Sequence, residues 1–141
     1  MVWGEDVFIP QVVLYEVLAK PGADSVRIYK ASQTWLKALK PNENSDLLDN
    51  LAIQRLDAGE RQVIELSLSI PSPVIAVIDD AAGRRTAKQL GLEVIGFAGL
   101  LLIAKKRGLI ELVSPLLIAA RQEGYWLSDE LLKAVKSLVN E

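Results

Sequence analysis

Apolar and polar positions along the chain follow two periods, which together predict an alternation of strands and helices. Short apolar runs rich in β-branched residues indicate strands at 7–9, 34–39, 74–78 and 93–95. Longer stretches with helical spacing predict helices at 10–19, 23–32, 46–56, 61–69, 81–90, 96–107, 114–123 and 129–139. Because strands and helices alternate over most of the length, the pattern predicts an α/β fold with a parallel sheet flanked by helices.

Two carboxylates follow the most continuous of the apolar runs. Val74–Ile78 leads directly into Asp79 and Asp80, and a predicted helix begins at Ala81. Ligands of open α/β sheets bind beyond the carboxyl ends of the strands, so this pair is a candidate metal or polar site. Asp80 also has the simpler role of capping the helix. Asp79 enters the edge of the core, where a carboxylate is costly unless it is paired or bound to a metal.

Two further acids stand near the ends of predicted elements. Glu16 lies on the first helix, where it either pairs with Lys20 on the surface or points inward as a ligand. Glu60 follows Asp57 by three residues, which matches a capping box with aspartate in place of serine or threonine. Capping and metal binding do not exclude each other, so both roles stay open for Glu60.

The composition narrows the possible chemistry. With 141 residues, 50% of them hydrophobic and 24% charged, the chain is expected to form one compact domain over residues 1–141. It contains no cysteine and no histidine. This excludes disulfides, thiol nucleophiles, histidine bases and the usual zinc sites, and it leaves carboxylates as the main catalytic groups. A bound metal is then expected to be Mg²⁺ or Mn²⁺, which prefer oxygen ligands.

No segment of the sequence suggests a membrane. The uncharged apolar stretch at 94–104 has 11 residues, whereas a membrane span needs about 18. The N-terminus shows no basic start followed by an apolar segment and a cleavage site. We therefore expect a cytoplasmic protein without membrane association.

The charges are unevenly divided along the chain. Residues 1–80 carry 7 basic and 12 acidic side chains, and residues 81–141 carry 9 basic and 6 acidic ones, for a net charge of −2. An acidic site beside a basic flank would suit an anionic substrate, although ordinary solvated helix faces explain the same counts. Arg84, Arg85 and Lys88 are candidates for phosphate contacts beside the acid pair, with plain exposure to water as the alternative.

Several segments together form a pattern that covers nearly the whole chain, at 8–10, 13–17, 56–66, 76–80, 84–92, 94–96 and 101–110. Their order and spacing resemble the PIN domain, specifically its prokaryotic branch of nucleic-acid-binding proteins. A response-regulator receiver also ends a strand in two aspartates. That alternative fails because only 61 residues follow Asp80 and no later apolar strand ends in the aspartate that would accept a phosphoryl group.

The resemblance implies a three-layer α/β/α fold with a small parallel sheet, and metal-dependent hydrolysis of RNA phosphodiesters. Proteins of this branch often act as the toxin of a toxin–antitoxin pair, so RNA and an antitoxin protein are the implied partners. Glu16, Glu60 and Asp79 match three of the family's four acids, and Asp80 assists them or caps the helix. These carboxylates would hold one or two Mg²⁺ or Mn²⁺ ions.

One departure from the family pattern affects the expected activity. PIN domains open with a central strand that ends in the first catalytic aspartate, whereas Met1 here falls just before the second strand. Asp6 precedes the wrong strand and does not take that role. Three arrangements would each account for the unpaired backbone groups that a missing strand leaves. They are an upstream start, closure of the two flanking strands, and a second copy that fills the gap in a homodimer. We expect weakened or absent nuclease activity, with a non-catalytic module that binds nucleic acid or protein as the alternative.

Overall fold

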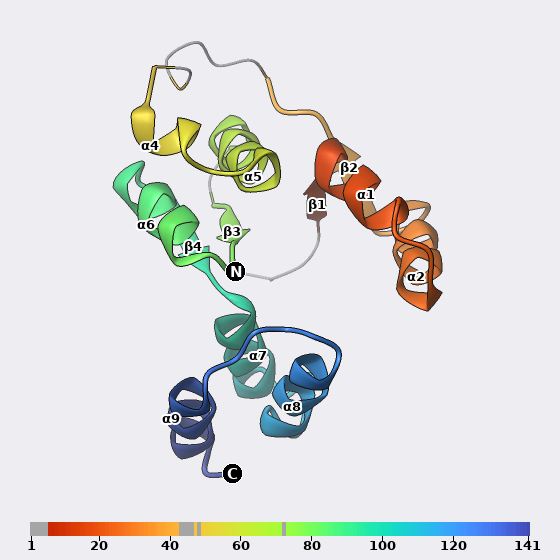
Figure 1. Ribbon diagram of the computed structural model, residues 1–141, viewed down its shortest axis with the longest axis vertical. Helices are drawn as coiled ribbons and strands as arrows, with labels where there is room; N and C mark the ends of the chain where they lie inside the picture. Colours follow the sequence, from red (N-terminus) through yellow and green to blue (C-terminus); the bar gives the residue numbers. More distant parts are fainter. Residues whose placement is uncertain (1–5, 43–46, 48, 72) are drawn as a thin grey trace. The chain divides into compact units, whose positions relative to one another are not determined.

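The computed structural model describes residues 6–42, 47, 49–71 and 73–141 (Figure 1). The chain divides into two compact units, an N-terminal unit of residues 1–94 and a C-terminal unit of residues 95–141. Each is described by itself, and the expected single domain over 1–141 stays a prediction. The helices and small parallel sheets confirm the expected PIN-like α/β/α fold class.

The elements of the N-terminal unit are β1 (Val7–Pro10), α1 (Gln11–Leu18), α2 (Ala23–Ser32), β2 (Leu36–Leu39), α4 (Leu51–Gln54), α5 (Ala58–Ser69), β3 (Ile75–Val77) and α6 (Ala81–Gln89). Strand β4 (Glu93–Ile95) crosses the boundary between the units. The C-terminal unit continues with α7 (Phe97–Lys106), α8 (Ser114–Gln122) and α9 (Asp129–Val139). Most predicted elements are confirmed to within one or two residues at each end.

The described strands form two sheets of two strands each. Strands β1 and β2 are parallel, with Val7 opposite Leu36 and Pro10 opposite Leu39, and β3 pairs with β4. Among the strands that the structure describes, β1 and β3 do not pair, so closure of the flanking strands, one of the three alternatives, is not observed there. Helix α5 contacts both β1 and β3 (Figure 1). A helix about 10 Å wide covers about two strand spacings, so it can pack on both strands while they stay apart.

Helix α5 and strand β3 contribute to the core of the N-terminal unit. Ala76 and Ile78 are buried while Val77 between them is exposed, as the two-residue period of a strand requires. The helix contributes Ile64, which is fully buried. The core cluster consists of Ile53, Leu56, Ile64, Ala76, Ile78, Ala87 and Val94. Burial of these side chains fixes the start of α5 and the end of β3 on one compact scaffold.

Two sequence predictions need correction in this unit. The helix expected over 46–56 is broken by Asn50, whose side chain accepts hydrogen bonds from the N–H groups of Ala52 (2.9 Å) and Ile53 (3.2 Å) and so caps the short α4. Positions 46 and 48 of that prediction lie outside the described residues. The strand expected from residue 34 begins only at Leu36, because the N–H groups of Thr34 and Trp35 both donate to the carbonyl of Ala31 and keep the chain in a turn.

The C-terminal unit has its own core, built from all three of its helices. Its buried side chains are Leu101, Val113, Leu117, Leu127, Leu132 and Val135. Ser128 caps α9, its hydroxyl accepting from the N–H of Leu131 at 3.1 Å. Across the described ranges of both units, no helix is long and apolar enough to cross a membrane.

Glu141, at the C-terminus, contacts the end of α7 and the start of α8. Its carboxylate, only 7% exposed, accepts hydrogen bonds from the N–H groups of Val113 (2.9 and 3.1 Å) and Ser114 (3.2 Å) at the start of α8. Lys105 lies 3.6 Å from the same carboxylate. Burial opposes ionisation of this carboxyl, but the amide hydrogen bonds and the Lys105 charge hold the pKa of Glu141 below its usual value.

We expect Glu141→Ala to destabilise the C-terminal unit, because it leaves buried N–H groups at the start of α8 without an acceptor. The measurement is amide hydrogen exchange, which should become faster across α8. Because the folded-state pKa is lowered, the Glu141 contribution is present above the unfolded pKa near ~4.3 and is lost as the pH falls through the folded value. Glu123→Ala, an exposed acid after the same helix, is the control and should leave exchange unchanged.

Candidate functional site

The start of helix α5 holds two of the candidate acids in a fixed geometry. The N–H of Glu60 donates to Oδ1 of Asp57 at 2.8 Å, and the N–H of Asp57 donates to Oε2 of Glu60 at 3.4 Å. The predicted capping box is therefore confirmed. Both carboxylates lie at the positive end of the helix dipole, which partly offsets their mutual repulsion.

Glu16 approaches the same helix start from α1. The position that a Cβ would occupy on Gly59 is 3.4 Å from Oδ1 of Asp57 and 3.8 Å from Oε2 of Glu16. Among the ion pairs of the described residues none joins Glu16 to Lys20, so the surface pair that the sequence allowed does not form. Glu16 remains exposed to solvent and is placed beside Asp57.

Asp80 reaches the same region from the start of α6. Its Oδ2 accepts a hydrogen bond from the N–H of Gly83 at 2.9 Å, which confirms the predicted helix cap. A Cβ built on Gly83 would lie 3.7 Å from Cδ of Glu60 and 3.8 Å from Oδ2 of Asp80. The buried Gly83 therefore lies between two carboxylates that are twenty positions apart in the sequence.

We call Glu16, Asp57, Glu60 and Asp80 the acidic cluster. Its electrostatic effect is seen at Glu60, whose pKa is raised first by burial and then by the charges of Asp57 and Asp80, against the lowering effect of the Asp57 N–H. Carboxyls whose ionisation is opposed by burial and by neighbouring acids are common at functional sites and also occur in structural networks.

Each anchored carboxylate of the cluster uses only one of its oxygens within the protein. Oδ2 of Asp57, Oε1 of Glu60 and Oδ1 of Asp80 accept no hydrogen bond from the described residues. Such oxygens are suitable ligands for Mg²⁺ or Mn²⁺. Within the described part of the chain, however, no three acidic side chains are grouped closely enough to form a ready metal site. The donor chemistry thus fits a hard cation, while the full ligand arrangement is not preformed.

Asp79 and Arg84 differ from what the sequence suggested. Asp79 is exposed, so the expected cost of burying its carboxylate does not arise, because the chain leaves the core directly after Ile78. The guanidinium of Arg84 donates to the carbonyl oxygens of Ile78 (3.3 Å) and Asp79, and so braces the end of β3 against α6. Arg85 and Lys88 are exposed on α6. Roles for these residues in metal or RNA binding stay predictions.

Asp6 takes no part in the acidic cluster. It precedes β1 and forms an ion pair with Lys37 of β2. Since Leu36 lies opposite Val7, this pair marks the starting edge of the sheet. Helix α1, which carries Glu16, begins at the other end of β1, and the decision not to give the missing acid's role to Asp6 stays a prediction.

The sequence did not identify Asp57 and Gly83 as parts of the candidate site. Asp57 was explained as a helix cap, and the structure shows that this cap also lies beside Glu16. Gly83 is the third residue of α6, and alanine is a better helix former than glycine by up to about 1 kcal/mol. A glycine inside a helical pattern could have been recognised from the sequence, since such a glycine often marks a close approach of neighbouring groups.

Comparison with known proteins assigns the chain to a family. A family model described as a PIN domain matches residues 3–141, which is almost the full length. No curated protein and no solved structure matches the sequence significantly. The match agrees with the α/β architecture. By this match, the chain belongs to the PIN-domain family.

Proposed function

We propose that the chain is a metal-dependent ribonuclease that hydrolyses RNA phosphodiesters at the acidic cluster. The observation that carries the proposal is the convergence of carboxylates from α1, α5 and the cap of α6 around two glycines. Membership of the PIN-domain family supports nuclease chemistry, and family members generally use divalent metals. The same resemblance supports a cytoplasmic toxin with an antitoxin partner as the finer form of the proposal.

In this proposal, the side chains of the cluster have separate tasks. Asp57, Glu60 and Asp80 would hold Mg²⁺ or Mn²⁺ through their free oxygens, and the anchored oxygens keep each carboxylate from turning away. A bound ion supplies a more acidic water and stabilises negative charge on the phosphate. Glu16 and the exposed Asp79 complete the proposed ligand set from the family resemblance.

The test is cleavage of a labelled single-stranded RNA with the purified chain, in millimolar Mn²⁺ and in EDTA. We expect cleavage with the metal, none in EDTA, and a loss of about 100-fold in Asp80→Asn. Glu93→Gln changes an exposed acid on β4 and should retain full activity. Cleavage that persists in EDTA, or no cleavage with any divalent metal, would contradict the proposal.

A second candidate function is a binding module without catalysis. It is favoured by the absence of a ready three-acid metal site among the described residues. Thermal unfolding separates the two candidates, because a metal at about 100 times its Kd stabilises the folded state by about 2.7 kcal/mol. A rise in Tm with Mn²⁺ supports the nuclease. An unchanged Tm at millimolar Mn²⁺ favours the binding module.

A further inference from the structure

A short segment of the N-terminal unit is strongly basic although the protein as a whole is acidic. Residues 20–40 contain five basic side chains and one acidic one, in a chain of net charge −2. All five basic side chains are exposed, and they are Lys20, Arg27, Lys30, Lys37 and Lys40. The single acid, Asp24, is 3.8 Å from Arg27 in an exposed pair, which water and salt weaken. The segment therefore presents an excess of positive charge to solvent.

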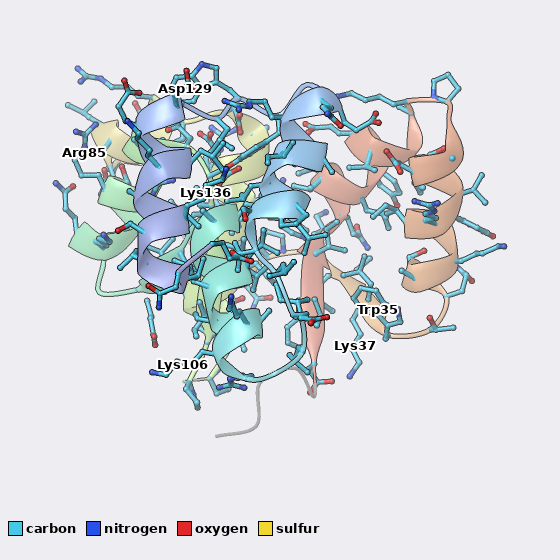
Figure 2. All side chains as sticks on the ribbon, turned by 90° about the horizontal axis from the view of Figure 1, so that it is seen from below. Trp35, Lys37, Arg85, Lys106, Asp129 and Lys136 are labelled. Atoms are coloured by element: carbon cyan, nitrogen blue, oxygen red, sulfur yellow. The ribbon has the colours of Figure 1, made fainter. Side chains whose placement is uncertain are left out.

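Two aromatic side chains stand among these cations. Tyr29 on α2 is 55% exposed and Trp35, just after the helix, is 60% exposed. The backbone of Trp35 is fixed, because its N–H donates to the carbonyl of Ala31 at 3.1 Å and the buried Leu36 follows at once. Figure 2 shows Trp35 near the end of α2, with its side chain pointing away from the ribbon. An indole held on rigid backbone but left in water gains little from folding.

Helical spacing places Arg27, Lys30 and Tyr29 in that order around the exposed side of α2, over an arc of about 160°. Ala31 is buried and Ile28 is partly buried, so they form the inner side of the helix. Arg27 and Lys30 are three positions apart and are neighbours on the helix surface, whereas Tyr29 is turned by about 100° from Lys30. Lys37 is engaged elsewhere, since it pairs with Asp6 and lies over the ring of Phe8. We call Arg27, Tyr29, Lys30 and Trp35 the α2 face.

We propose that the α2 face binds single-stranded nucleic acid, with bases stacked on Trp35 and Tyr29 and phosphates held by Arg27 and Lys30. Exposed rings among cations suit unpaired bases, whereas the bases of a duplex are already stacked on each other. The choice of nucleic acid over an acidic protein partner rests on the proposed ribonuclease function. The positive charge of the face matches a phosphate backbone.

The α2 face lies at a different edge of the sheet from the acidic cluster. Trp35 directly precedes Leu36, which is opposite Val7 at the start of β1, whereas Glu16 follows the end of β1 through Pro10. Binding at the face can therefore be measured without metal and without cleavage. Failure of this proposal is thus distinguishable from failure of the nuclease proposal.

The test is fluorescence anisotropy of a labelled oligouridylate with the full chain in EDTA. Trp35→Ala should weaken binding about tenfold, and Trp35→Phe should restore most of it, because stacking needs only an aromatic ring. Trp126→Ala is the matched control, since that indole is 82% exposed in the C-terminal unit and should not affect affinity. Arg27→Ala should reduce the salt slope of log K by about 0.7.

Three results would overturn the proposal. They are unchanged affinity in Trp35→Ala, equal weakening by Trp126→Ala, and binding of duplex RNA as tight as that of the single strand. Unfolding temperatures of the variants confirm that they remain folded. Should the wild-type chain not bind oligouridylate but bind an acidic peptide through Trp35, the face is a protein-binding surface and the nucleic-acid proposal is wrong.

Discussion

Glu60→Gln is expected to abolish metal-dependent RNA cleavage while leaving the metal-free protein at least as stable as the wild type. Activity should fall by about 100-fold or more, because the change removes a charge from the centre of the acidic cluster. Stability should not fall, because glutamine at this position also completes a capping box with Asp57. Cleavage assays in Mn²⁺ and thermal unfolding in EDTA measure the two effects.

The pH dependence of stability gives a second readout at Glu60. Burial and the charges of Asp57 and Asp80 raise its folded-state pKa, so the folded protein binds more protons than the unfolded chain between the two pKa values. Wild-type stability therefore falls as the pH rises through this window. At higher pH, the ionised carboxylate of Glu60 costs the folded state stability. Glu60→Gln removes that cost, and we expect a gain of about 1 kcal/mol or less at neutral pH.

The control for Glu60→Gln is Glu65→Gln, which makes the same chemical change further along α5. It should keep both the activity and the increase of Tm with Mn²⁺. A fall in metal-free stability in Glu60→Gln would mean that Glu60 acts mainly as a cap. Full activity in that variant would remove Glu60 from the proposed metal site.

Local signals explain why most of the fold could be predicted from the sequence. The apolar run of β3, the capping box at Asp57 and the serine cap at Ser128 each depend on neighbouring residues alone. The prediction failed at Asn50 and Trp35, where one side-chain cap and one shared carbonyl decided the boundary. The separation of β1 from β3 depends on packing against α5, which no local pattern encodes.

The candidate site could be predicted only in part, for a related reason. Glu16 and Glu60 were named from the resemblance to the PIN domain and Asp80 from its place after a strand, and the structure brings atoms of these three close to Gly59 of α5 or Gly83 of α6. Asp79 was chosen from a burial cost that its exposed position does not support. Asp57 was overlooked because its cap explained it fully. A residue's proximity to a side chain forty positions away depends on tertiary packing, which spacing alone does not reveal.

Gly83→Ala is expected to lower both stability and activity, although alanine is the better helix former by about 1 kcal/mol. The new Cβ would lie 2.8 Å from Cγ2 of Ile78, which is buried and cannot move freely, and overpacking of this kind costs about 1–3 kcal/mol. After the helix gain is subtracted, the net loss is up to about 2 kcal/mol, or a Tm lower by up to about 8 °C. Because α6 must shift, Asp80 moves relative to Glu60, and Mn²⁺-dependent cleavage should fall with the Tm. Gly99→Ala is the matched control, since Gly99 is the third residue of α7 as Gly83 is of α6, and the nearest atom to its new Cβ is Cβ of Ile95 at 3.5 Å. That change should leave the free energy of unfolding unchanged or raise it by up to about 1 kcal/mol, and the Tm should follow. Equal behaviour of the two variants would show that the contact at Gly83 does not hold the acidic cluster together.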